Sequence, residues 1–178
     1  EWISDSMLYS HGTIGGLKPD GTSFHHGGHY PAYSVGAFAA VGDYCFFSRN
    51  TDFAPKEESR RCFKNSLMAM HNYTQTRDWG FAACGRHPLD GAIPEPDVTA
   101  FARLALLGDL TGSGKEADPE LAGAYIALGG TDKEILSQFK KMGISALEPA
   151  DGFTVYNYNA QGIHRRSDWM VSVKGYNS

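Results

Sequence analysis

The sequence predicts a mainly α-helical unit over 1–149, followed by the first antiparallel strands of a truncated second unit over 150–178. Two observations predict this fold class. Before Pro149, apolar residues recur at spacings of three and four, which is typical of helices that bury one face. After Pro149 they alternate with polar residues, as in Trp169-Met170-Val171-Ser172-Val173, which is typical of strands. The predicted domain boundary therefore lies near residue 149.

Each helix is predicted from its apolar spacing and from residues that start or end helices. The predicted ranges are 34–50 with Ser34 as N-cap, 57–73, 97–110, 119–128 with Asp118 as N-cap, and 132–142. Just before the last range, Thr131 and Glu134 lie three residues apart, which predicts a capping box. The stretch 79–96 is predicted to be a loop because it is rich in glycine and proline.

Only two or three strands are predicted after the helices. Alternation at Phe153 and Val155 and over 169–173 predicts strands, and the stretches 159–162 and 166–168 predict turns. So few strands make a poor independent sheet. Since the chain also begins without methionine, we expect it to be a piece of a larger protein.

Composition excludes several classes of function. The formal net charge of −4 argues against a general nucleic-acid binder, although local clusters of Arg and His can still hold an anionic substrate. The three cysteines form no CxxC pair, so neither a zinc ribbon nor a disulfide framework is predicted. No run of the sequence approaches the roughly 20 apolar residues of a membrane span.

The segment 24–34 carries three imidazoles and two phenols in a stretch constrained by glycine and proline. Imidazole exchanges protons near neutral pH, whereas a phenol is a useful base only where nearby cations favour its ionised form. The segment therefore predicts a proton-transfer site in which His26 and Tyr33 face one cleft. Two alternatives remain: these are ordinary loop residues, or His25, His26 and His29 bind a metal ion.

Two further basic clusters are candidates for anion binding. Arg86 lies in a loop between glycine and proline, which suits a guanidinium that binds a carboxylate through two parallel hydrogen bonds, although a surface salt bridge with Asp90 is the alternative. The run His164-Arg165-Arg166 lies at a predicted hairpin. It is interpreted as a basic rim for sulfate or carboxylate groups, or alternatively as a solvated turn.

The motifs taken together resemble a known family. They are Gly16-Leu17-Lys18-Pro19-Asp20-Gly21-Thr22, His26, Tyr30-Pro31-Ala32-Tyr33-Ser34, Gly85-Arg86-His87-Pro88 and Gly162-Ile163-His164-Arg165. In order and spacing they resemble the chondroitin sulfate ABC lyase branch of polysaccharide lyase family eight. The resemblance implies the C-terminal part of an incomplete (α/α) toroid, followed by the start of an antiparallel β-sandwich, in a secreted or periplasmic enzyme.

The resemblance also implies an activity and the residues that perform it. The expected reaction is β-elimination at hexosamine–uronate 1,4 linkages of chondroitin or dermatan sulfate, which gives 4,5-unsaturated uronides. His26, Tyr33 and Arg86 match the catalytic histidine, tyrosine and arginine, and the family's glutamate is expected after Ser178. The expected substrate-binding residues are His25, His29, Tyr30, His87, His164 and Arg165.

The resemblance further implies partners and cofactors. We expect a sulfated glycosaminoglycan substrate, the remaining domains of the parent enzyme, and no required cofactor, with a calcium or magnesium ion as an optional aid. Two other functions stay open at this point. One is a non-catalytic glycan-binding fragment, and the other is a metal-dependent glycan hydrolase that uses His25, His26 and His29.

Overall fold

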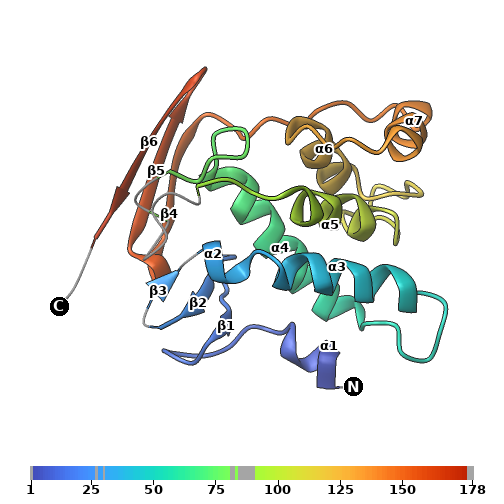
Figure 1. Cartoon of the computed structure of the whole chain (residues 1–178), viewed down its shortest axis with the longest axis horizontal. Helices are drawn as coiled ribbons and strands as arrows, with labels where there is room; N and C mark the ends of the chain where they lie inside the picture. The colour runs from blue at the N-terminus through green and yellow to red at the C-terminus, as the bar shows by residue number, and fades with distance from the viewer. Residues whose placement is uncertain (1, 27, 30, 81–82, 84–90, 176–178) are drawn as a thin grey trace.

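The computed structural model describes residues 2–26, 28–29, 31–80, 83 and 91–175. The described part is mainly helical and contains two small antiparallel sheets, as the sequence predicts at this coarse level. In Figure 1 the helices lie side by side, and the C-terminal sheet stands against one end of them.

Helix α5 packs against α3, α6 and α4, and the long helix α4 contributes the fully buried Leu67 and Met70 to the core. Helices α3 and α5 cross closely, because a Cβ placed on Gly42 would lie only 2.7 Å from the Cβ of Ala100. The helices are α1 (Trp2–Ser6), α2 (Pro31–Ser34), α3 (Ala37–Ser48), α4 (Glu57–Tyr73), α5 (Glu95–Ala105), α6 (Pro119–Ala127) and α7 (Lys133–Lys141).

The start of α3 differs from the prediction. Ser34 is not its N-cap, because Ser34 is the last residue of the short helix α2. Gly36, with φ of 79°, separates α2 from α3. A residue without Cβ adopts this left-handed conformation at little cost, so a glycine rather than a serine marks the boundary.

The N-caps of α6 and α7 are both aspartates. Asp118 caps α6 as predicted, and its carboxylate accepts hydrogen bonds from the backbone N–H groups of Glu120 and Leu121. The predicted capping box at Thr131 is wrong. Asp132 caps α7 instead, since its carboxylate accepts hydrogen bonds from the backbone N–H groups of Glu134 and Ile135 in the first turn. The Thr131 hydroxyl donates to Glu95 at 2.9 Å.

Helix α5 begins earlier and ends earlier than predicted. It starts at Glu95 and includes Pro96 in its first turn, where the missing N–H of proline has no intrahelical partner to lose. It ends at Ala105, and Gly108 then turns the chain with φ of 107°. The prediction that Pro96 belongs to a loop is therefore wrong.

Each sheet has three antiparallel strands in sequence order. Sheet one holds β1 (Gly16–Leu17), β2 (Ser23–His25) and β3 (Gly28–His29); sheet two holds β4 (Gly152–Tyr156), β5 (Gln161–Arg166) and β6 (Trp169–Lys174), with the 3-10 helix η2 (Asn157–Asn159) between β4 and β5. The strands β4 and β6 are confirmed, whereas β5 includes Gln161, Gly162 and Arg166, which were predicted to be turn residues. Sheet one and helices α1 and α2 were not predicted; each of these elements has five residues or fewer, which is too short to show a period.

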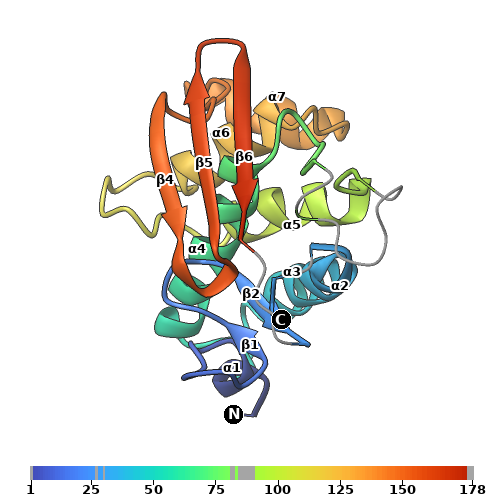
Figure 2. The same cartoon turned by 90° about the vertical axis from the view of Figure 1, so that its left-hand side faces the viewer.

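Sheet two packs onto the C-terminal end of α4 (Figure 2). Its inner face contributes Tyr156 and Ile163 to the hydrophobic core. Arg165, on the same face, is buried and donates hydrogen bonds to the carbonyl oxygens of Asn72 at 3.1 Å and Thr74 at 2.7 Å. The predicted domain boundary near residue 149 stays a prediction.

The outer face of sheet two is apolar and uncovered in the described structure. Its exposed apolar residues are Phe153, Val155, Trp169, Val171 and Val173. Across the described helices, no stretch is both long and apolar enough to cross a membrane.

The two aspartate caps predict different stabilities. Asp118 is fully buried, and it also accepts from the N–H of Leu110 and pairs with Lys64 at 2.7 Å. We expect Asp118→Ala to lower the free energy of unfolding by about 2 to 4 kcal/mol, because three backbone N–H groups lose their acceptor and Lys64 keeps only its ion pair with Glu120. Urea denaturation measures this loss.

The control is Asp132→Ala, which removes the same two capping bonds at an exposed site. We expect it to lower the free energy of unfolding by only about 1 kcal/mol. Equal losses for the two variants would contradict the role given to burial and to Lys64.

His71 predicts a dependence of stability on pH. Burial, with a smaller contribution from the positive charge of Arg165, lowers the pKa of this imidazole from 6.5 to about 4. As the pH falls from 6.5 to 4, the unfolded chain binds a proton that the folded chain excludes, so stability falls by up to about 3 kcal/mol. Urea denaturation across this pH range should show the slope. His71→Gln should reduce it, and the same change at the exposed His11 should not.

Candidate active site

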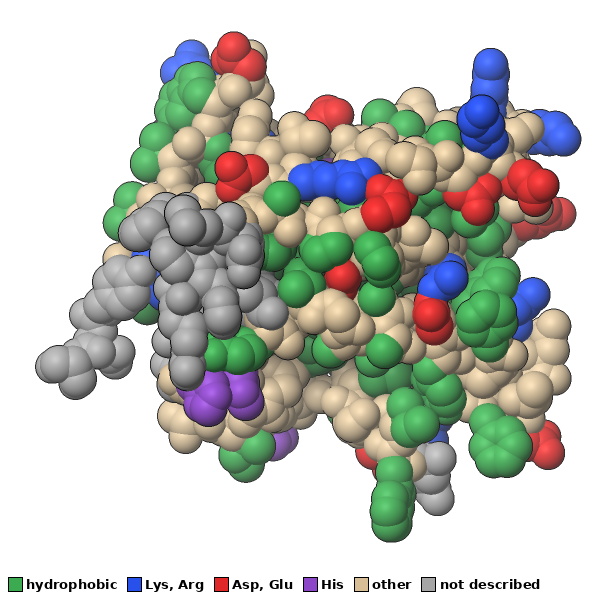
Figure 3. Space-filling model, viewed as in Figure 1, with side chains coloured by type: hydrophobic (Ala, Val, Ile, Leu, Met, Phe, Trp, Pro, Cys, Tyr) green, Lys and Arg blue, Asp and Glu red, His purple; other side chains and the backbone are tan. Residues whose placement is uncertain are grey.

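The β2–β3 hairpin and helix α2 bring three predicted site residues together. The ring centroids of His25 and His26 lie 4.0 Å apart, and the Tyr33 ring lies 5.1 Å from His25 and 5.7 Å from His26. Both histidines are exposed and Tyr33 is half-buried. Histidine side chains form a small patch on this side of the molecule (Figure 3).

The local backbone explains this cluster. His25 is the last residue of β2 and pairs with Gly28 of β3, so the chain reverses directly after it. His26, in the turn, has φ of 50°, a left-handed conformation that is uncommon for a residue with a side chain. The turn therefore places the two adjacent imidazoles close together, and α2 follows immediately and supplies Tyr33.

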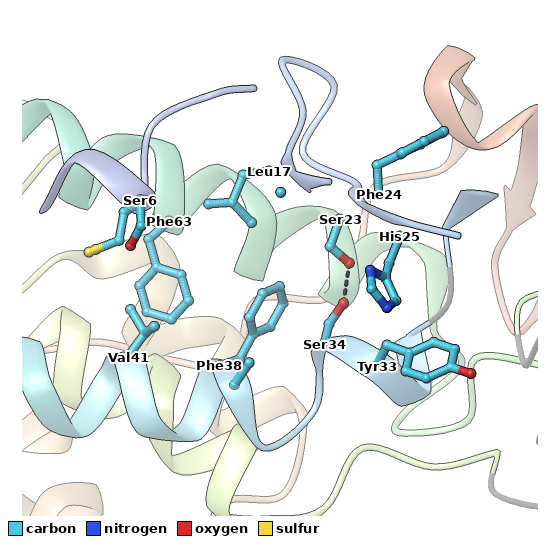
Figure 4. A pocket seen from close by; sticks show the side chains of 13 residues that line it. Ser6, Leu17, Ser23, Phe24, His25, Tyr33, Ser34, Phe38, Val41 and Phe63 are labelled. Atoms are coloured by element: carbon cyan, nitrogen blue, oxygen red, sulfur yellow. Dashed lines mark hydrogen bonds between the residues drawn. The ribbon is translucent and has the colours of Figure 1, made fainter. Parts of the chain in front are cut away.

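A hydrogen bond between hydroxyls joins the two elements of the site. The Ser23 and Ser34 side chains are bonded to each other (Figure 4), which connects β2 to α2. Ser23 precedes His25 by two residues, and Ser34 follows Tyr33 directly. This bond therefore fixes the strand that carries the imidazoles relative to the helix that carries the phenol.

A cavity of about 310 Å³ opens beside the cluster. His25 and Tyr33 lie at one end of it, and Phe63 and Val41 lie toward the other (Figure 4). The other lining residues are mostly apolar as well, and include Leu17 and Phe38. The imidazole and the phenol lie together at one end, whereas Ser6 is the polar residue labelled at the end that holds Phe63 and Val41 (Figure 4).

This arrangement can bind an acidic group and transfer protons. Two exposed imidazoles lie next to one phenol, and each of the three groups can donate or accept a hydrogen bond. A carboxylate can be bound by protonated imidazoles at the same place where the phenol accepts or returns a proton. The ring centroids of His26 and Tyr33 lie 5.7 Å apart, but His26 is not among the residues that line the cavity, so the expectation that the two face one cleft stays a prediction.

The other predicted site residues either lie away from the cluster or have side chains that the structure does not describe. Tyr30, Arg86 and His87 lie outside the described residues, and for His29 only the backbone position in β3 is described. His164 is exposed on the outer face of β5. Arg165 is buried on the inner face of the same strand and is bonded to α4, so neither residue lies in the histidine–tyrosine cluster.

The metal alternative has no described ligand set. Among the residues whose side chains the structure describes, no three His, Cys, Asp or Glu side chains lie close enough together to hold a metal ion. The His29 side chain, the third member of the proposed His25, His26 and His29 set, is outside that group.

Sequence analysis missed Ser23 and Ser34 as residues of this site. The signal for Ser23 is its spacing of two from His25, since side chains two apart lie on the same face of a strand. That signal is usable only once β2 is recognised, and β2 has three residues. Ser34 was interpreted as a helix cap instead.

The fold and the site agree with a family match. The sequence profile of the family described as "Lyase, catalytic" matches residues 1–134, so the chain belongs to that family. The predicted relationship to a family of lyases is thus confirmed.

Individual relatives extend the match to almost the whole chain. The chain is 29% identical over 182 residues to a chondroitin sulfate ABC exolyase of Proteus vulgaris, and 32% identical over 165 residues to a chondroitin sulfate ABC endolyase of the same organism. It is 27% identical over 197 residues to a chondroitin sulfate ABC exolyase of Bacteroides thetaiotaomicron. These alignments cover 98%, 92% and 98% of this chain.

The chain is short beside these relatives. It spans 17%, 15% and 19% of their respective lengths. The predicted resemblance to the chondroitin sulfate ABC lyases is confirmed by the alignments. What the relatives' names say of their substrates belongs to those proteins, and its transfer to this chain is a proposal.

Proposed function

We propose that this chain carries part of the active site of a glycosaminoglycan lyase that cleaves hexosamine–uronate 1,4 linkages of chondroitin or dermatan sulfate by β-elimination. The observation that carries the proposal is the contact among the rings of His25, His26 and Tyr33, with centroids 4.0 to 5.7 Å apart, in a member of the lyase catalytic family. The products are 4,5-unsaturated uronides.

The first requirement of this reaction is to neutralise the uronate carboxylate. The C5 proton is α to that carboxylate, and its removal creates a dianion unless a cation or hydrogen-bond donor takes up the charge. We assign this task to His26 together with Arg86. Pre-oriented donors at the position where charge develops are commonly the largest contribution to such catalysis.

The second requirement is a base beside C5. Tyr33 takes this proton as phenolate, and the positive charges of His26 and Arg86 favour the ionised form of the phenol. The C4–O4 bond breaks as the C4–C5 double bond forms, and the proton returns to O4 so that the leaving sugar departs as an alcohol. Tyr33 is the donor when both groups leave from one side of the ring; for the epimeric uronate, His26 acts as the base from the opposite face.

The remaining expectations from the resemblance become proposals for the whole enzyme. We assign His25, His29, Tyr30 and His87 to binding of carboxylate and sulfate groups. Arg165 is left out because its guanidinium is already bonded to the end of α4. The steps above use no organic or redox cofactor, and the optional calcium or magnesium ion stays a prediction.

The parent protein supplies the rest of the site. The chain spans less than a fifth of its relatives' length, which supports further domains as partners of this one. We propose that these domains complete an (α/α) toroid and a β-sandwich, provide the glutamate expected after Ser178, and act in a secreted or periplasmic enzyme. The apolar outer face of sheet two supports the sandwich.

Replacement of the proposed base tests the mechanism. We expect Tyr33→Phe, made in the whole protein that carries this chain, to lower kcat by about 10²- to 10⁴-fold, because the phenyl ring cannot accept the C5 proton. Binding of chondroitin sulfate oligosaccharides should change little. The ultraviolet absorbance of the unsaturated product measures turnover.

Tyr44→Phe is the matched control, because it removes a phenol whose hydroxyl donates to the Phe53 carbonyl, away from the cluster. Substantial turnover by Tyr33→Phe would sink the assignment of the base. If the chain only binds glycans, the parent protein would release no product from chondroitin sulfate. If it is a metal-dependent hydrolase, the products would have saturated ends, and chelation of zinc would stop the reaction.

Arg86 provides a second test. We expect Arg86→Ala to lower kcat more than it raises KM, because the guanidinium acts most strongly on the charge that develops in the transition state. Steady-state kinetics with chondroitin sulfate measures both constants. An unchanged kcat would place Arg86 outside the catalytic site.

A further inference from the structure

The β1–β2 turn, residues 18–22, lies at the end of β2 opposite the histidines. Its conformation is set by Asp20, whose Oδ1 accepts hydrogen bonds from the Thr22 N–H at 3.0 Å and from the Thr22 hydroxyl at 2.7 Å. The Thr22 carbonyl accepts from the Lys18 N–H at 2.8 Å and so closes the turn. The direction in which the chain enters β2 therefore depends on this carboxylate.

The second oxygen of Asp20 makes a contact across the molecule. Oδ2 accepts a hydrogen bond at 3.0 Å from the backbone N–H of Tyr158 in η2. Lys18 Nζ lies 5.4 Å from the centroid of the Tyr158 ring and 4.9 Å from that of Phe24 in β2. Tyr158 is thus held by its backbone and by its ring, and both contacts lead to the turn that begins β2.

Lys18 makes this joint rigid. It is fully buried, and its Nζ donates to the Ser10 hydroxyl at 2.9 Å and to the carbonyls of Gly12 and Ile14 at 2.9 and 2.6 Å. Burial lowers the pKa of this amine, and the negative charge of Asp20 opposes that shift. Three hydrogen bonds therefore hold the buried amine in place beside the turn.

The turn also rests directly on α4. Gly21 has φ of 85°, and a Cβ there would lie 2.7 Å from the Ala69 Cβ and 2.8 Å from the Asn65 carbonyl oxygen. Asn65 Nδ2 donates to the Pro19 carbonyl at 3.2 Å. The turn is consequently fixed between α4 on one side and η2 on the other.

We propose that Asp20 is a positioning residue of the active site: by bonding the β1–β2 turn to η2, it fixes the strand that presents His25 and His26. The strand β2 has only three residues, so a rotation of the backbone at the turn also moves the imidazoles. The inference rests on the proposed lyase function. Asp20 itself touches no reacting atom in this assignment.

The chain contains a matched control for this aspartate. Asp109 makes the same turn, with Oδ1 accepting from the Thr111 N–H at 2.6 Å and the Thr111 hydroxyl at 2.5 Å. Its Oδ2 accepts from the Gly114 N–H at 2.9 Å, which is within the same loop. Asp109→Ala therefore removes a comparable set of bonds without breaking a connection between sheets.

The experiment compares Asp20→Ala with Asp109→Ala in the whole protein that carries this chain. We expect Asp20→Ala to lower kcat about 10- to 100-fold with KM changed less than about threefold, because a misplacement of about 1 Å can lower a rate about 100-fold. Asp109→Ala should stay within about twofold of the parent in both constants. Asp20→Asn retains one acceptor oxygen and should fall between them, which provides a second variant if Asp20→Ala does not fold.

A readout independent of turnover separates this inference from the lyase assignment. With 3-fluorotyrosine incorporated at position 33, the ¹⁹F chemical shift reports the position of that ring beside His25 and His26. We expect the resonance to move in Asp20→Ala and Asp20→Asn and to stay in place in Asp109→Ala.

Each outcome decides one of the two claims. An unmoved resonance with unchanged kcat overturns the positioning role even if Tyr33→Phe is inactive. If the resonance moves in the Asp20 variants while Tyr33→Phe still cleaves substrate, the positioning role of Asp20 is supported. The assignment of Tyr33 as the base is then overturned. A rise in KM alone, or equal losses in Asp20→Ala and Asp109→Ala, also overturns the positioning role.

Discussion

The backbone carbonyl groups at the C-terminal end of α4 need hydrogen-bond donors, and the donor that they receive attaches sheet two to the helices. The last carbonyls of a helix have no partner within the helix and carry partial negative charge. Arg165 of β5 supplies that partner by bonding to the carbonyls of Asn72 and Thr74. Sheet two is therefore attached to the helices by a buried cation as well as by the apolar contacts of Tyr156 and Ile163.

The same helix supports the active site from its side. Asn65 and Ala69 of α4 contact the β1–β2 turn, and the turn leads into the strand that carries His25. One rigid helix thus serves as the reference for both sheets. The histidines are exposed, so apolar packing alone cannot hold them. Their placement depends on polar contacts of Asp20, in the turn before β2, and of Ser23, the first residue of β2.

Sequence patterns predicted the long elements well. Helix α4 follows its apolar spacing over the whole of 57–73, and Asp118 caps α6 because a carboxylate before a proline and a glutamate is a strong start signal. The β1, β2 and β3 strands could not be predicted, since strands of two or three residues are too short to show a period. They form because side chains far apart in the sequence bond to their turn.

Arg165 shows the same limit in another way. The run His164-Arg165-Arg166 was assigned to one basic rim, yet adjacent residues of a strand point to opposite faces. Arg165 therefore shares the inner face with Ile163, and His164 lies on the outer face. The alternation of the strand is visible in the sequence. The sequence does not show that the carbonyls of Asn72 and Thr74 lie where they can accept hydrogen bonds from a buried arginine.

The outer face of sheet two sets two expectations against each other. His164 lies in the central strand with its ring 6.4 Å from that of Phe153 and 5.3 Å from that of Trp169. Around it, Phe153 is 69% exposed and Val173 is 64% exposed, which is unusual for a sheet face that meets only water. If a second sheet covers this face, as the sandwich proposal requires, His164 is enclosed and cannot bind substrate. The apolar character of its neighbours favours the cover, so the substrate role of His164 is the weaker of the two expectations.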